Sequence, residues 1–121
     1  MRPSEQLQQF LDFVKTCQED YQIAYSSVGD EDKRLQDLLH ALEFSQDKYS
    51  MHREALKLWD SRNRRRRSKD TVQLCENIVQ YFQSPAGKQT LKDLQQLLGR
   101  QRKTEQYLEG HREYRKRVVE G

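Results

Sequence analysis

The sequence predicts an all-α protein, a small bundle of about four helices. Apolar residues between Pro3 and Leu108 recur at intervals of three and four, the period of an α-helix, and no segment alternates convincingly over a strand's length. Each helical segment is amphipathic and joined to the next by a short connection, so none can bury its apolar stripe alone. At 121 residues the chain is about one domain long. We expect a single helical domain over residues 1–110 and a basic C-terminal tail over residues 111–121.

The first predicted helix begins at Pro3 and Ser4. From there one apolar stripe faces a core over about six turns; it consists of Leu7, Phe10, Leu11, Val14, Cys17, Tyr21 and Tyr25. Residues 26–29, Ser-Ser-Val-Gly, are expected to interrupt this helix, because serine and glycine favour turns.

A second helix is expected to start at the acidic residues 30–32, since the positive end of a helix dipole favours carboxylates. Its apolar face is supplied by Leu35, Leu38, Leu39 and Leu42. Neither glycine nor proline occurs between Gly29 and Pro85, so the internal boundaries of this stretch stay open. Apolar residues seven apart favour one long or kinked helix that reaches about Arg67, and residues 45–47 are the alternative break; the spaced residues are Leu35, Leu42, Tyr49 and Leu56.

Two further helices complete the prediction. Asp70 and Gln73 have the spacing of a capping box, which favours a helix over about 70–83 with a stripe of Val72, Cys75, Ile78, Val79 and Phe82. Ser84 is a cap residue followed by Pro85 at the first helical position. The last stripe runs to a natural stop at Gly110 and consists of Leu91, Leu94, Leu97, Leu98 and Leu108.

The chain is polar for a folded domain. Its hydrophobic and charged fractions are both 34%, and its mean hydropathy is −1.14. Low apolar content keeps open a second architecture, a long helical hairpin that completes its core only as a homodimer. Four residues lie off the main stripes and are candidates for a second interface or a dimer contact: Phe13, Phe44, Leu58 and Tyr81.

Charge is distributed unevenly along the chain, whose formal net charge is +3. Residues 1–61 hold seven Lys/Arg and twelve Asp/Glu, whereas residues 62–121 hold fifteen and seven. The candidate binding residues are therefore basic: Arg62, Arg64, Arg65, Arg66, Arg67 and Lys69, with a second group of Arg100, Arg102 and Lys103 that continues into the tail. If the two groups meet in space, they form one basic patch.

The arginine run at residues 64–67 allows three interpretations. Four consecutive arginines splay around a helix, so about two of them could contact the phosphates of RNA or DNA. The same residues could instead contact an acidic protein partner. They could also stay solvated or pair across the bundle with acidic residues of the first half, and surface ion pairs of that kind contribute little to stability. The candidate partners are Asp12, Glu19, Asp20, Asp37 and Glu43.

Motifs for catalysis are missing from the sequence. The three histidines, His40, His52 and His111, are far apart and have no metal-ligand spacing, and no glycine-rich phosphate loop is present. Cys17 and Cys75 fall on apolar stripes, where a cysteine usually behaves as a small reduced hydrophobic residue. We therefore expect a protein that is not an enzyme and binds no cofactor. With no apolar stretch of membrane-spanning length and no secretory signal, we expect a cytoplasmic location and no membrane partner.

Four segments resemble those of small helical proteins, of unknown function, from prophages and mobile elements of Gram-positive bacteria. They are Gln-Asp-Leu-Leu-His at 36–40, the basic run at 64–70, Leu-Leu-Gly-Arg-Gln-Arg-Lys at 97–103 and Arg-Glu-Tyr-Arg at 112–115. The resemblance implies an accessory gene product, such as a regulator, a packaging or replication helper, or an inhibitor of a host defence complex. It carries no functional residues over to this chain.

Taken together, these features favour a non-catalytic helical binding protein that occupies a surface on a host protein or ribonucleoprotein complex. The contact region would be the two basic groups. The alternative is a nucleic-acid-binding protein that contacts the phosphates of RNA or DNA through its arginine-rich segment.

Overall fold

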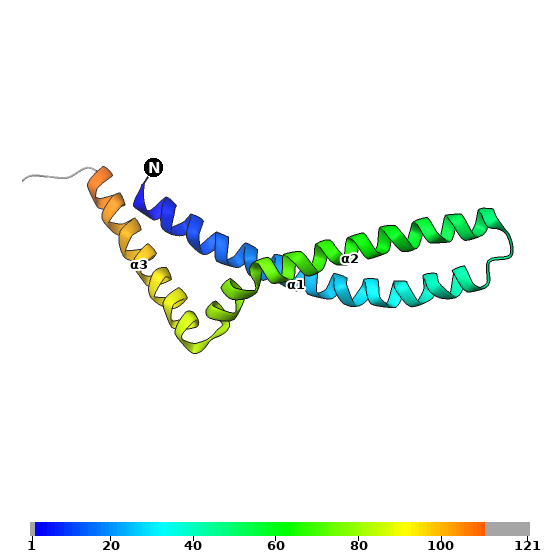
Figure 1. Cartoon of the computed structure of the whole chain (residues 1–121). Coiled ribbons are helices and arrows are strands. Elements are labelled where there is room, and N and C mark those ends of the chain that lie inside the picture. Colours follow the sequence, from blue (N-terminus) through cyan, green and yellow to red (C-terminus); the bar gives the residue numbers. More distant parts are fainter. Residues whose placement is uncertain (1, 111–121) are drawn as a thin grey trace, which may run out of the picture.

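The structure is a computed structural model that describes residues 2–110. This part of the chain forms three α-helices and no strand: α1 (Pro3–Glu43), α2 (Lys48–Gln83) and α3 (Pro85–Glu109) (Figure 1). The all-α class is confirmed. The number of helices is smaller than expected because α1 continues through the break expected at 26–29, and α2 continues through the start expected at Asp70. The basic tail predicted at 111–121 lies outside the described residues.

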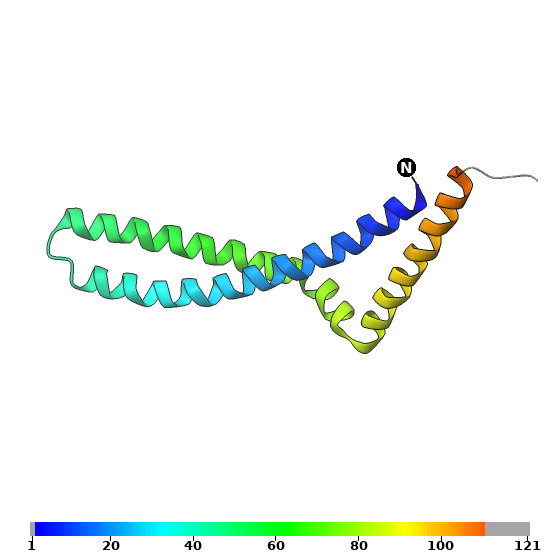
Figure 2. The ribbon, with the colours of Figure 1, turned by 180° about the vertical axis from the view of Figure 1, so that it is seen from behind.

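Helices α1 and α2 form a long antiparallel hairpin, which both views of the ribbon show (Figures 1 and 2). Residues 44–47 connect them, and Asp47 caps α2 by accepting a hydrogen bond of 2.6 Å from the Ser50 N–H. That hydrogen bond holds the pKa of the Asp47 carboxyl below its ordinary value. The break that the sequence left as an alternative at 45–47 is thus the real one, and the favoured prediction of one long or kinked helix from residue 30 to about Arg67 is wrong.

The seam between α1 and α2 has the spacing of a coiled coil. Inward-facing residues alternate at intervals of three and four on both helices, and each of them is buried or half-buried. On α1 they are Val14, Cys17, Tyr21, Ala24, Val28, Glu31, Leu35, Leu38 and Leu42. On α2 they are Glu54, Leu58, Ser61, Arg65, Ser68, Val72, Cys75, Val79 and Phe82.

Helix α3 turns away from α2 and returns along the N-terminal part of α1 (Figure 1). Polar contacts fix this pairing: the Ser4 hydroxyl donates to Glu105 at 2.8 Å, Arg102 donates to Gln8 at 2.7 Å, and a third contact joins Arg2 to Glu109. The N-terminal part of α1 therefore packs on α3, and the remainder packs on α2.

The corner between α2 and α3 is tight. Ser84 caps α3 by accepting from the Gly87 N–H at 3.1 Å, and Pro85 occupies the first turn, as the sequence predicted. Gly87 is buried, and a Cβ at that position would lie 1.8 Å from the Tyr81 carbonyl oxygen. Glycine at residue 87 thus permits the close approach of the two helices. The predicted stop at Gly110 is also confirmed.

Two predicted boundaries are wrong. The helix does not break at residues 26–29, and no helix begins at the acidic residues 30–32, because α1 continues through both segments. A glycine inside a helix costs only about 1 kcal/mol, which packing along the seam can offset. Nor does a helix begin at Asp70, since α2 runs unbroken from Lys48 and the seam continues through Ser68 and Val72.

The buried core is small for a chain of this length. Its apolar members are Val14, Cys17, Ala24, Cys75, Val79, Phe82 and Leu98. Among the four residues predicted to lie outside the core, Phe13, Phe44 and Tyr81 are exposed, but Leu58 is half-buried in the seam. None of the described helices is both long and apolar enough to cross a membrane.

Candidate binding surface

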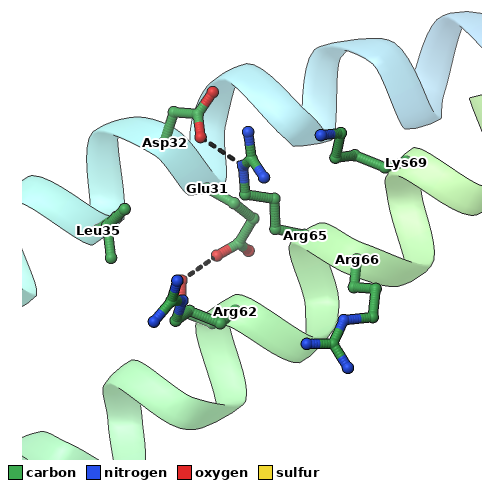
Figure 3. Close-up of a pocket in the computed structure, with 8 residues that line it drawn as sticks. Glu31, Asp32, Leu35, Arg62, Arg65, Arg66 and Lys69 are labelled. Carbon is green, nitrogen blue, oxygen red and sulfur yellow. Dashed lines mark hydrogen bonds and ion pairs between the residues drawn. The ribbon is translucent and has the colours of Figure 1, made fainter.

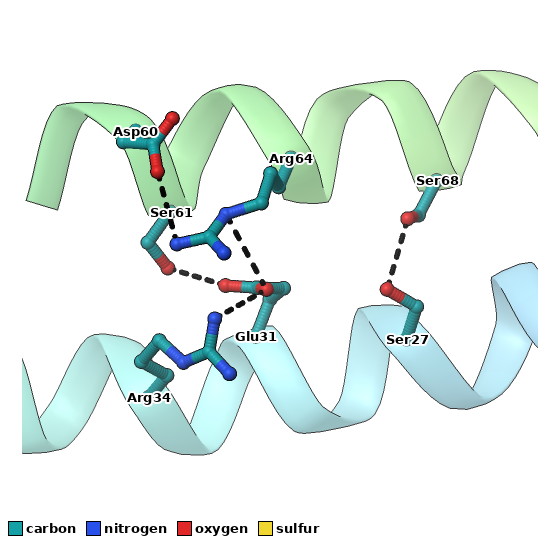
Figure 4. Close-up of polar contacts among 7 residues, drawn as sticks. All are labelled: Ser27, Glu31, Arg34, Asp60, Ser61, Arg64 and Ser68. Atoms are coloured by element: carbon teal, nitrogen blue, oxygen red, sulfur yellow. Dashed lines mark hydrogen bonds and ion pairs between the residues drawn. The ribbon is translucent and has the colours of Figure 1, made fainter. Parts of the chain in front are cut away.

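A polar layer interrupts the seam midway along the hairpin (Figure 4). The buried Glu31 accepts a hydrogen bond of 2.5 Å from the Ser61 hydroxyl and pairs with Arg34 at 3.0 Å and Arg64 at 3.9 Å. A buried carboxylate is costly unless it is paired in this way. One turn before Glu31, Ser27 and Ser68 lie 3.1 Å apart across the seam.

The antiparallel hairpin divides the arginine run into two sets. Arg64 lies 3.0 Å from Asp60 and also contacts Glu31, and the Arg65 Nε donates to Asp32 of α1 at 2.5 Å. These two arginines therefore pair within the molecule, as one of the three interpretations proposed, but their partners are Glu31, Asp32 and Asp60 and not the acidic residues that the sequence suggested. The pairing follows from the chain direction, because the antiparallel turn at 44–47 places residues 31 and 32 opposite residues 61–65.

The remaining cations of the run are free. Arg62, Arg66, Arg67 and Lys69 are exposed and make no hydrogen bond or ion pair with any residue from 2 to 110. On a helix, positions 62, 66 and 69 share one face, whereas Arg67 lies on the other side. We call Arg62, Arg66 and Lys69 the basic stripe. Trp59, which is 68% exposed, lies three residues before Arg62 and extends the same face.

The basic stripe forms one wall of a groove of about 410 Å³ between α1 and α2 (Figure 3). Asp32 and Leu35 of α1 form the opposite wall, and Glu31, Ser61 and Arg65 complete the lining. Four basic residues thus face two carboxylates, which already have partners in Ser61 and Arg65. A second groove shares Asp32 and Lys69 with the first and adds the apolar residues Tyr25, Val28 and Val72.

The second predicted basic group lies elsewhere. Arg100, Arg102 and Lys103 are on α3, where Arg102 contacts Gln8 near the start of α1. The basic stripe lies beside Asp32, which is 24 residues further along α1, or about 36 Å at 1.5 Å per residue. Among the described residues, therefore, the two groups do not form one patch.

No group of three or more His, Cys, Asp or Glu side chains within residues 2–110 is arranged to hold a metal ion. His40 lies 3.8 Å from Glu43 at the exposed end of α1. Cys17 and Cys75 are free thiols that meet in the core across the seam. Burial raises the pKa of the Cys17 thiol, and the neighbouring Cys75 raises it further.

Sequence reasoning missed the polar layer and the division of the arginine run. The signal for the layer is present, since Glu31, Ser61 and Ser68 occupy seam positions in the three-four spacing. The signal for the stripe is the spacing 59, 62, 66, 69, which places a tryptophan and three cations on one helical face.

Comparison of the chain with protein-family models, curated proteins and solved structures finds no match. The resemblance to proteins of prophages and mobile elements therefore stays a prediction.

Proposed function

We propose that this is a non-catalytic binding protein whose basic stripe contacts the phosphate backbone of a nucleic acid. The observation that carries the proposal is the division of the arginine run. Arg64 and Arg65 are neutralised by acidic residues, whereas Arg62, Arg66 and Lys69 have no partner among the described residues and face one groove. Unpaired cations on one face are what phosphate binding requires.

The dimensions of the stripe support a backbone contact. Residues 62 to 69 span about 10 Å along α2 at 1.5 Å per residue. Along the duplex axis, one strand of B-form DNA advances 3.4 Å per phosphate. A stripe parallel to that axis therefore matches about three nucleotide steps. Trp59 stands at the end of the stripe, where an exposed indole can stack on a base without reading its sequence. The proposal therefore predicts low sequence specificity and steep dependence on salt.

A second candidate is an acidic surface on a protein partner, such as a host complex that this protein regulates or inhibits. It is favoured by the apolar residues Tyr25, Val28 and Leu35 beside the stripe. Protein interfaces combine apolar contact with a charged rim, whereas a phosphate backbone gains little from such contact.

Fluorescence anisotropy with labelled single- and double-stranded RNA and DNA across a salt series tests the leading proposal. The variant Arg62→Ala, Arg66→Ala, Lys69→Ala should lose most of the affinity, and the slope of log K against log salt should become shallower by about 2 to 3. The matched control, Lys33→Ala, Lys88→Ala, Lys92→Ala, removes the same charge from exposed residues outside the stripe.

Equal loss of affinity in the two triple variants would show that net charge, and not the stripe, governs binding. No binding of the wild type at low salt would reject a nucleic-acid ligand. In that case a pull-down that retains a protein with the wild type and the control, but not with the stripe variant, supports the acidic partner.

A further inference from the structure

An apolar patch lies open at the corner where α2 gives way to α3. Phe10 of α1 contacts Phe82 of α2 edge-on at 6.1 Å between ring centroids, and it lies 6.2 Å from Phe13. Tyr81 packs on Phe82 at 5.0 Å. Phe82 is buried, but Phe13 and Tyr81 are each 50% exposed and Phe10 is 41% exposed. The outer faces of these rings therefore remain uncovered.

The patch continues along α2. Leu74, Ile78 and Tyr81 are four and three residues apart and share one helical face. Ile78 packs against the core cluster of Cys17, Cys75 and Val79, whereas Leu74 is 81% exposed. We call Phe10, Phe13, Leu74, Ile78 and Tyr81 the corner patch. It is an outward extension of the core and not a set of isolated surface residues.

Charge is scarce on the α2 part of the corner patch. Residues 71–87 include a single charged side chain, Glu76, although 34% of the whole chain is charged. Depletion of charge together with enrichment in aromatic residues distinguishes the centre of a protein interface from ordinary surface. The phosphate-binding stripe proposed above ends at Lys69, five residues before Leu74 and on a different face of α2, so the corner patch needs an occupant of different chemistry.

The exposed area exceeds that of a compact monomer. The chain exposes 10,176 Å², whereas a folded monomer of 14.6 kDa is expected to expose about 6,900 Å². An upper bound for residues 111–121 is the area that a fully unfolded segment of that length exposes. When this area is subtracted, the rest of the chain still exceeds the area expected for its mass by about 1,700 Å². A standard interface buries about 800 Å² on each partner, so the excess is sufficient for one.

We propose that the corner patch is the contact between two copies of this chain. A two-fold interface brings the same patch of both copies together, so it must be self-complementary. An apolar patch with few charges meets this requirement, because its copies do not repel one another. The proposal is independent of nucleic-acid binding, since the basic stripe contributes no residue to the contact.

Sedimentation velocity and light scattering of the full chain at about 1 to 100 μM test the proposal. We expect a dimer of twice the 14.6 kDa chain mass. Leu74→Glu and Tyr81→Glu should each raise the dimer dissociation constant at least about tenfold, because each places a charge in an apolar contact. Both residues are exposed, so helical content by circular dichroism should persist.

Leu56→Glu is the matched control. Leu56 is also on α2 and 55% exposed, but it lies towards the far end of the hairpin. Dimerisation should be unchanged in this variant. A wild-type chain that stays monomeric at 100 μM overturns the proposal, and so does a dimer that Leu74→Glu and Leu56→Glu weaken equally, since the contact would then lie elsewhere.

Discussion

The middle of the α1–α2 seam and its end at the corner use the same spacing for different chemistry. In the middle, seam positions hold Glu31, Ser61 and Ser68, which hydrogen-bond across the hairpin. At the corner end, equivalent positions hold Cys75, Val79 and Phe82, which are buried in the apolar core. Two regions with one geometry can thus have separate roles.

The difference indicates that the corner end supplies stability and the middle supplies register. Apolar burial contributes about 25 cal/mol for each Å² removed from water, but it tolerates sliding of one helix past the other. A buried polar pair loses its partner when the register slips, so it penalises every other alignment. Three experiments test this division of roles.

The largest effect is expected at the corner end. Phe82→Ala removes a buried ring that contacts Phe10 and Tyr81, and it should lower the free energy of unfolding by about 3 kcal/mol. Urea unfolding followed by circular dichroism, at one fixed protein concentration, measures the change. The control Phe44→Ala truncates a ring that is 77% exposed and should change stability by less than about 0.5 kcal/mol. Similar losses in the two variants would contradict the assignment of stability to the corner.

A smaller effect is expected in the middle. Glu31→Ala leaves the Ser61 hydroxyl without its acceptor and should cost about 2 kcal/mol in the same assay. Glu31→Leu combined with Ser61→Ala replaces both partners, so it should restore most of that stability but broaden the amide resonances as alternative registers become populated. Sharp resonances from a stable double variant would show that the polar layer does not set the register.

The smallest effect is expected on the rate at which a buried thiol is alkylated, and not on stability. Burial raises the pKa of Cys17, so less thiolate is present at pH 8 and alkylation by iodoacetamide should be slow, accelerating as the pH rises. A Cys75→Ser variant reports Cys17 alone. Ser27→Cys in a background without both native cysteines places a thiol in the half-buried polar layer, where the reaction should be faster. Equal rates would mean that the two regions are equally open to water.

The helical class and three boundaries could be predicted because they depend on local signals. A period of three and four residues is independent of the tertiary arrangement, and Pro3, Ser84-Pro85 and Gly110 act through their own backbone chemistry. The segment at 26–29 carried equally local turn signals, yet it is helical. There the seam decides the outcome, since Ser27 finds a partner in Ser68, which is 41 residues away. No local pattern records that contact.

The candidate site shows the same limit. The sequence identified residues 62–69 as candidates for binding but could not divide them, because the contacts from Arg65 to Asp32 and from Arg64 to Glu31 are set by the alignment of α2 on α1. Only the contact between Arg64 and Asp60 is local to α2. The distance from this region to Arg102 likewise depends on α3 returning to the start of α1. Composition reveals which charges exist, and only the fold reveals which of them are already neutralised.

Helix α1 presents its two partners on different sides. Ser4, Gln8 and Leu11 face α3, whereas Cys17 and Tyr21 face α2, and at 100° per residue these directions differ by roughly a third of a turn. The three helices therefore cannot close around one axis, and α2 and α3 diverge at an open angle (Figure 2). Phe13 and Tyr81 are uncovered because α2 and α3 contact different sides of the continuous helix α1, and not because the chain is too short to cover them.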